Sequence, residues 1–309
     1  MLQKKKAVVI IGPTAVGKTA TSIKLAQKFN GEIISGDSMQ IYRHLDIGTA
    51  KVKPAEMAGI RHYLLDIRDV EQNYTVYEFQ QAAQKLIVQI LQQQHLPFIV
   101  GGTGFYIKAL VDNLNLGGPH TGQQSASIRQ QYSQLRELLG KEKLWQILRQ
   151  RDPQAAAQIS PQNSRRVIRA LEVLDATGEP FSQQQQSQAA IEYLIIGLTT
   201  KRQLLYQRIN QRVDLMLQAG LKKEAAWLYE RRNQVPQASQ GIGYKEFFPY
   251  FAGNITSQEA VTLIKRNSRR FAKRQLTYFR HQLTVHWFDI VRHPQQLQQI
   301  SALIKKFQE

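Results

Sequence analysis

The segment that most constrains this chain is Gly12-Pro13-Thr14-Ala15-Val16-Gly17-Lys18-Thr19. It follows an apolar run over residues 7–11 and precedes a segment with helical spacing of apolar residues. A strand, a turn framed by glycines and a helix are the context in which G-x-x-x-x-G-K-[ST] binds phosphate groups. Loop N–H groups and the positive end of the helix dipole converge on phosphate oxygens. The segment therefore predicts a site for a diphosphate or a triphosphate.

Each residue type in this loop has a chemical reason to be there. Gly12 and Gly17 permit a tight backbone path. Lys18 is expected to place its positive charge on a phosphate, and Thr19 to offer its hydroxyl to Mg²⁺, so Mg²⁺ is the expected cofactor. The alternative is an ordinary strand–turn–helix unit that carries Lys and Thr by chance.

The charge balance predicts a polyanionic partner. The 309 residues include 41 Lys and Arg but only 23 Asp and Glu, which leaves a formal net charge of +18. Nucleic acid fits this excess better than an anionic membrane surface does. A uniformly basic surface is the alternative, and clustering of the charges distinguishes the two.

The cysteine count and the hydropathy of the chain exclude several classes of protein and of metal site. The sequence has no cysteine, so disulfides and thiolate metal sites are excluded. No segment approaches the roughly 20 apolar residues that cross a bilayer. The apolar run that follows Lys4, Lys5 and Lys6 is too short for the apolar region of a signal peptide. We therefore expect a cytoplasmic protein without a membrane partner.

Alternating strand and helix patterns predict an α/β fold with a P-loop NTPase-like parallel sheet. Apolar strands are expected at residues 7–11, 33–35, 63–66, 98–100 and 193–198, and an amphipathic helix at 75–94. Asp37 follows the second strand and the turn at 101–104 follows the fourth, where parallel sheets gather functional groups. Asp37 remains open between a general base, a water-mediated Mg²⁺ ligand and a helix N-cap.

The pattern changes between residues 117 and 188. Helical segments dominate there, with breaks at Asp152-Pro153 and Ser160-Pro161. We interpret residues 117–188 as a helical insertion into an α/β core formed by residues 1–116 and 189–309. Arg165, Arg166 and Arg169 share helical spacing, which fits either an anion-binding face or a solvated one.

Basic residues also cluster on a predicted helix near the C-terminus, where no acidic residue occurs between Glu259 and Asp289. Residues four apart share a helix face. The cluster forms one row of Lys265, Arg269 and Lys273, and a second row of Arg266, Arg270 and Arg274. Such a stripe suits a phosphate backbone and favours a nucleic-acid partner.

Several segments together resemble the tRNA dimethylallyltransferase family, also called isopentenyl-tRNA transferases. They are residues 12–19, 37–42 (DSMQIY), 101–106 (GGTGFY), 165–173 (RRVIRALEV), 241–246 (GIGYKE) and 272–275 (AKRQ). The resemblance implies transfer of a dimethylallyl group from dimethylallyl diphosphate to the exocyclic N6 amine of the adenosine immediately 3′ of the anticodon in tRNA, with release of pyrophosphate. It implies dimethylallyl diphosphate and the tRNA anticodon stem-loop as partners, and we expect a monomer.

The resemblance also implies roles for individual residues. Residues 12–19 hold the diphosphate, with Lys18 and a Thr19-bound Mg²⁺ neutralising charge. Asp37 acts as the general base and Thr103 orients the target nucleotide. An arginine on the diphosphate falls at Arg212 or Arg208; we prefer Arg212, but spacing does not decide.

An adenine amine is inaccessible in a stacked loop, so the base must flip into a pocket. The helical insertion is expected to clasp the anticodon stem-loop. The implied tRNA contacts are Asp37, Ser38, Met39, Gln40, Thr103, Arg129, Gln162, Asn163, Ser164, Arg165, Arg166, Lys273 and Arg274.

Two other functions would use the same residues. A P-loop kinase would bind ATP through Lys18 and Thr19, with Asp37 activating a hydroxyl group. A non-catalytic, nucleotide-controlled RNA-binding module would leave Asp37 and Thr103 with structural roles. The basic stripe and the arginine-rich insertion are unnecessary for a small-molecule kinase.

Overall fold

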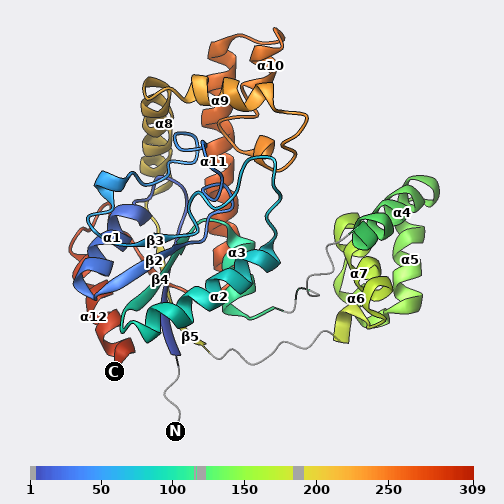
Figure 1. Ribbon diagram of the computed structural model, residues 1–309, viewed down its shortest axis with the longest axis horizontal. Coiled ribbons are helices and arrows are strands. Elements are labelled where there is room, and N and C mark those ends of the chain that lie inside the picture. The colour runs from blue at the N-terminus through green and yellow to red at the C-terminus, as the bar shows by residue number, and fades with distance from the viewer. Residues whose placement is uncertain (1–4, 115, 117–122, 184–190) are drawn as a thin grey trace. The chain divides into compact units, whose positions relative to one another are not determined.

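The structure is a computed structural model that describes residues 5–114, 116, 123–183 and 191–309 (Figure 1). The chain forms two compact units. One, called the core unit here, comprises Met1–Val111 and Ala189–Glu309, and the other, the insertion unit, comprises Asp112–Gln188. The boundaries expected from sequence, between 116 and 117 and between 188 and 189, fall on or beside residues outside the described ranges.

The core unit is built on a six-stranded sheet in the order β3-β2-β4-β1-β5-β6. Its strands are β1 (Lys5–Ile11), β2 (Gly31–Ser35), β3 (His62–Tyr63), β4 (Leu96–Gly101), β5 (Ile191–Leu198) and β6 (His286–Phe288). Every neighbouring pair is parallel, and in the register Val8 of β1 faces Phe98 on one side and Leu194 on the other. The predicted α/β fold with a parallel sheet is confirmed.

Helices cover both faces of this sheet, which explains why residues 7–11 of β1 are apolar without interruption. Ala7, Val9 and Ile11 face one hydrophobic cluster, which includes Phe79 of α2 (Val76–Gln92). Val8 and Ile10 face the other, which includes Leu25 of α1 (Lys18–Lys28). The other α-helices of the core unit are α3 (Gly104–Val111), α8 (Arg202–Gln218), α9 (Leu221–Glu230), α10 (Phe248–Phe251), α11 (Ser257–Gln282) and α12 (Gln296–Gln308).

Local sequence determines where the long helices begin. Thr75 and Glu78 form a capping box at the start of α2, and Thr256 and Glu259 form one at the start of α11. Each pair satisfies backbone N–H groups that the first helical turn leaves unpaired. Helix α11 thereby has a defined start before it runs past the sheet.

The predicted strand at residues 63–66 is wrong beyond Tyr63. Leu64 and Asp66 adopt positive φ angles of 61° and 54°, which a strand does not allow. The buried ammonium of Lys51 contacts the carboxylates of Asp66 and Asp46, at 2.5 and 2.6 Å. The pair with Asp66, which spans 15 positions, holds residue 66 in a turn.

The insertion unit is helical. It contains α4 (Gln123–Leu139), α5 (Lys141–Arg151), α6 (Pro153–Gln158) and α7 (Ser164–Thr177) around a small apolar core that includes Leu148 and Leu171. Asp152 caps α6 and Asn163 caps α7, so the helices change at the two predicted breaks.

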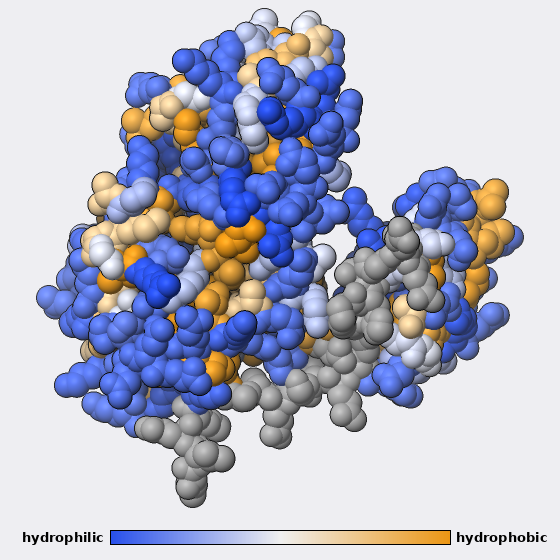
Figure 2. All heavy atoms as spheres, viewed as in Figure 1, coloured by the Kyte–Doolittle hydropathy of each residue, from blue (hydrophilic) through white to orange (hydrophobic). Residues whose placement is uncertain are grey.

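Hydrophilic residues cover most of the visible face of the core unit, with apolar areas between them (Figure 2). Within the described ranges, no helix combines the length and apolarity needed to cross a membrane.

Candidate active site

The loop between β1 and α1 is shaped by two glycines. Gly12 has φ 154°, and a Cβ there would lie 2.6 Å from the carbonyl oxygen of Leu198. Gly17 has φ 105° and stands at the start of α1. Any side chain at Gly12 would push β5 away, so this glycine is required for close packing of the loop.

Lys18 lies against this loop. Its Nζ donates to the carbonyl oxygens of Gly12, at 3.0 Å, and Pro13, at 2.8 Å. Burial lowers the pKa of Lys18 to about 8; nearby Arg212 also lowers it, whereas Asp37 opposes the shift. The ammonium lacks a close carboxylate partner in the described part of the chain, so a bound anion would stabilise its charge.

Two arginines reach the loop from α8. Arg212 Nη1 donates to Thr14 Oγ1 at 3.1 Å, and Arg208 Nε donates to the carbonyl oxygen of Ala15 at 2.9 Å. Burial lowers the pKa of Arg212, while Arg208 is exposed. The structure thus brings both candidate arginines to the same loop, with Arg212 the less accessible to water.

Asp37 and Thr103 meet at the ends of β2 and β4. Asp37 Oδ1 accepts from the backbone N–H of Met39 at 2.9 Å and of Gln40 at 3.4 Å. Thr103 Oγ1 accepts from Ser38 N at 3.0 Å. One Asp37 oxygen therefore has a cap-like role, while Oδ2 forms no hydrogen bond within the described residues.

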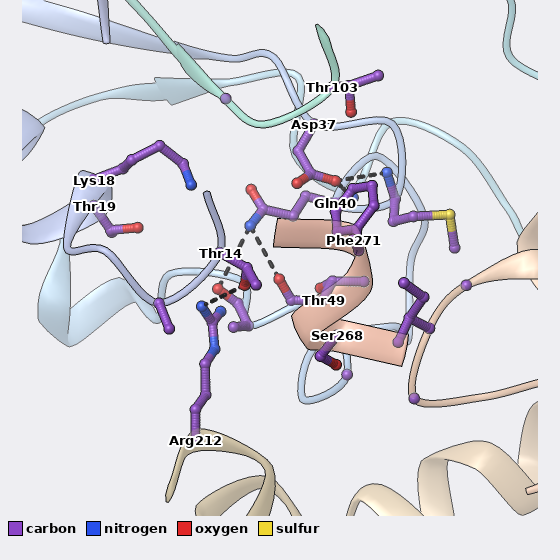
Figure 3. Close-up of a pocket in the computed structure, with 18 of the residues that line it drawn as sticks. Thr14, Lys18, Thr19, Asp37, Gln40, Thr49, Thr103, Arg212, Ser268 and Phe271 are labelled. Carbon is purple, nitrogen blue, oxygen red and sulfur yellow. Dashed lines mark hydrogen bonds between the residues drawn. The ribbon is translucent and has the colours of Figure 1, made fainter. Parts of the chain in front are cut away.

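These groups share one pocket of about 850 Å³ in the core unit. Figure 3 shows Lys18 and Thr19 on one side, Asp37 and Thr103 on another, and Arg212 entering from α8. Helix α11 supplies Ser268, Phe271, Arg274 and Gln275 to the lining, and residues 240–245 supply a further wall. The pocket combines cations at one end with a carboxylate at another.

The segment Ser38-Met39-Gln40 forms part of the lining. Gln40 is held from both sides, because its Oε1 accepts from Ser35 Oγ at 3.1 Å and its Nε2 donates to the Thr49 carbonyl at 3.2 Å. Sequence reasoning missed what supports this wall. Glu224 of α9 accepts from the N–H groups of residues 46, 47 and 48 and from the hydroxyl of Tyr244 at 2.6 Å.

The predicted basic stripe on α11 is divided by its contacts. Lys265 forms an ion pair with Asp214 at 2.6 Å, and Arg269 donates to Asn210 Oδ1 at 2.7 Å, so both side chains bind α8. Lys273 and Arg274 are exposed. Arg266 and Arg270 are exposed as well. Four of the six cations of the stripe are therefore available to an external phosphate backbone.

The remaining predicted contacts lie in the insertion unit. Gln162, Asn163, Arg165 and Arg166 are exposed around the start of α7, whereas Ser164 is buried. Arg129 forms a two-pronged ion pair with the buried carboxylate of Glu172, at 2.9 and 3.0 Å. Its predicted contact with tRNA stays a prediction, and the ion pair gives the side chain a structural role as well.

The fold and the site define a P-loop α/β protein with a cationic, partly apolar pocket. The IPP transferase family model matches residues 40–282. The chain belongs to this family, the tRNA dimethylallyltransferases. That membership sets aside the kinase and RNA-binding-module alternatives.

Relatives match along nearly the whole chain. A tRNA dimethylallyltransferase from Limosilactobacillus fermentum is 54% identical over 299 residues, covering 97% of each chain. The solved full-length tRNA isopentenylpyrophosphate transferase from Bacillus halodurans is 46% identical, with a TM-score of 0.74 over 98% of this chain and 97% of that one. A eukaryotic dimethylallyltransferase, in a structural study of its action on tRNA, is 29% identical, with a TM-score of 0.80 over 97% and 78%.

Proposed function

We propose that this chain transfers the dimethylallyl group of dimethylallyl diphosphate to the N6 amine of the adenosine immediately 3′ of the anticodon in tRNA. The allylic C–O bond breaks and its electron pair leaves with pyrophosphate, a new N–C bond forms at the amine, and the amine loses a proton. The observation that carries this proposal is the single pocket that holds Lys18 and Arg212 together with Asp37 and Thr103. The leaving group needs the cations, and the attacking amine needs the carboxylate.

At the diphosphate end, residues 12–19 supply backbone N–H groups and the start of α1. Lys18 and Arg212 add positive charges. These charges stabilise the leaving group more strongly as negative charge accumulates on its oxygen. Both cations are partly buried without an ion pair in the described ranges, so they are already oriented and desolvated. Arg208, also from α8, provides a third cation, which is exposed.

The residues present fit Mg²⁺. Thr19 is exposed and lines the pocket, and hydroxyl and phosphate oxygens are ligands that Mg²⁺ prefers. The described residues contain no group of three His, Cys, Asp or Glu side chains that would form an all-protein metal cage. Thr19 would hold the ion together with diphosphate oxygens, and bound Mg²⁺ would neutralise charge on the leaving group.

At the amine end, Asp37 is the proposed base. The N–H groups of Met39 and Gln40 hold Oδ1, which orients Oδ2 as the acceptor for the amine proton. Thr103 fixes the Ser38 backbone beside it and would orient the flipped nucleotide.

The tRNA contacts are also part of this proposal. Ser38, Met39 and Gln40 would contact the target nucleotide, and Lys273 and Arg274 would bind phosphates. In the insertion unit, Arg129 and the segment 162–166 would contact the anticodon stem-loop. The protein would act as a monomer in the cytoplasm, where its tRNA is found.

A direct assay tests the proposal. Purified protein is incubated with Mg²⁺, unmodified tRNA and either dimethylallyl diphosphate or ATP, and the digested nucleosides are weighed by mass spectrometry. A prenyl-sized mass gain on adenosine that requires the allylic diphosphate is expected. Consumption of ATP with no such gain would refute the proposal.

A further inference from the structure

Gln275 joins the two glycine-rich turns of the pocket. Its Oε1 accepts from the backbone N–H of Thr14 at 3.0 Å, and its Nε2 donates to the carbonyl oxygen of Gly102 at 2.9 Å. Thr14 belongs to the diphosphate loop, and Gly102 directly precedes Thr103. A single amide therefore connects the segment that would hold the donor to the segment that would orient the acceptor.

The amide is fitted closely to its surroundings. Gln275 is only 6% exposed. A Cβ on residue 102 would lie 2.3 Å from Gln275 Nε2, although Gly102 itself has an ordinary backbone angle. The glycine is therefore required by the approach of the glutamine side chain and not by backbone conformation. A buried amide with both of its polar ends bonded has one well-defined position.

The connection extends as far as the proposed base. Thr103 Oγ1 accepts from Ser38 N, and Asp37 precedes this residue. On the other side, Arg212 donates to Thr14 Oγ1. A continuous series of hydrogen bonds and covalent links thus runs from the arginine at the diphosphate loop, through Gln275, to the Asp37 turn.

Helix α11 holds Gln275 in place. The helix is tied to α8 through Arg269 and Asn210, and its Asn267 Nδ2 donates to the buried carboxylate of Glu246 at 2.9 Å. Ala272, one turn before Gln275, is completely buried. The glutamine is thus presented by a rigid element rather than by a loop.

We propose that Gln275 is a positioning residue that sets the separation between the diphosphate loop and the Asp37–Thr103 side of the pocket. The inference rests on the proposed prenyl transfer but does not place Gln275 in contact with the reacting atoms. An in-line transfer requires the allylic carbon and the amine nitrogen to approach within about 3–3.5 Å, and a misplacement of ~1 Å costs about 10²-fold in rate. Loss of the link should therefore lower kcat while each substrate still binds.

The test compares two variants that break the same link from opposite ends. Gln275→Met keeps side-chain length and removes both hydrogen bonds, and Gly102→Ala pushes the amide away from its carbonyl partner. Each is expected to lower kcat about 10- to 100-fold, with KM for both substrates within about twofold of wild type. Because both changes break one link, the double variant should be no slower than the slower single variant.

Gln258→Met is the matched control, because Gln258 is an exposed glutamine on the same helix; its kcat should equal that of wild type. Thermal melting checks that each variant is folded, and Gly102→Ala alone carries the test if Gln275→Met is too unstable. A kcat within twofold of wild type, an effect confined to KM, or additive losses in the double variant would overturn the inference. An inactive wild-type enzyme would instead refute the proposed function.

Discussion

The insertion unit and the pocket of the core unit treat buried charge in opposite ways. In the insertion unit, the completely buried carboxylate of Glu172 is surrounded by Arg129, Arg169 and the hydroxyl of Ser125, at 2.7 to 3.0 Å. In the core unit, the partly buried cations Lys18 and Arg212 bond only to uncharged oxygens within the described residues. A buried charge with ion-pair partners has a structural role, and removing a partner destabilises the fold. Buried charges without such partners indicate a site for a ligand of opposite sign.

Replacing Asp37, whose Oδ2 forms no hydrogen bond within the described residues, should have the largest effect on activity. Asp37→Asn keeps Oδ1 as the acceptor for Met39 and Gln40 but cannot take a proton. We expect kcat to fall by about 10²- to 10⁴-fold, with tRNA affinity unchanged, measured by single-turnover kinetics and filter binding. A large loss of tRNA binding with surviving activity would reject the base assignment.

The two α8 arginines form no ion pair within the described residues, and they compare a partly buried unpaired charge with an exposed one. Arg212→Met should lower kcat about 10²-fold because it removes a desolvated cation from the leaving group. Arg208→Met, the matched control, should cost less than tenfold because the exposed charge of Arg208 is weakened by solvent. Equal losses, or a larger loss for Arg208→Met, would reverse the preferred assignment.

Breaking the satisfied charge should instead affect stability. Glu172→Gln is expected to lower the unfolding free energy of the protein by about 2 kcal/mol, measured by urea denaturation. The flanking arginines and the Ser125 hydroxyl overcome the effect of burial and hold the pKa of Glu172 below its usual value.

The sign of the accompanying pH dependence follows from that depressed pKa. The ionised carboxylate contributes its stability above the unfolded pKa, and the contribution disappears as pH falls through the folded pKa. The difference in stability between wild type and Glu172→Gln should therefore shrink at acidic pH. A difference that stays constant with pH would contradict the paired-charge interpretation.

The unpaired lysine should make donor affinity depend on pH. Because the pKa of Lys18 is about 8, the free enzyme loses this charge as pH rises above that value. Diphosphate binding should weaken up to about tenfold per pH unit above 8, because binding must then recover the proton. Calorimetric titration with inorganic pyrophosphate measures this. The loss of affinity above pH 8 should be absent in Lys18→Met, in which only the pyrophosphate itself titrates.

The smallest expected effect concerns the divided stripe on α11. Neutralising Lys273 and Arg274 should weaken tRNA binding and reduce its salt slope by about one for each phosphate that the protein no longer neutralises. Neutralising Lys265 should leave the slope unchanged, because Asp214 already pairs with that side chain. An equal change in slope for both variants would show that the ion pair with α8 opens on binding.

Several features of the protein could be predicted from short stretches of sequence. The apolar run of β1, the phosphate-binding loop, the capping boxes and the helix breaks at Asp152-Pro153 and Ser160-Pro161 all depend on neighbours a few residues away. Asp37 and Thr103 could be anticipated at one sheet edge because parallel strands place their carboxyl ends together. The family resemblance supplied the chemical roles that residue spacing alone left open.

Other features depended on contacts between distant segments. The strand expected at residues 63–66 ends early, where Asp66 pairs with Lys51 in a turn. Two of the six cations of the α11 stripe are engaged by Asp214 and Asn210. Gln275 reaches Thr14 across 261 positions, and Glu224 reaches residue 46 across 178.

The sequence by itself determined the phosphate loop and the helix boundaries, since these depend on local backbone chemistry. Only the tertiary structure decided which buried charges have a partner in the protein and which are left for a ligand. The reason is that packing between elements far apart in the chain selects the partners.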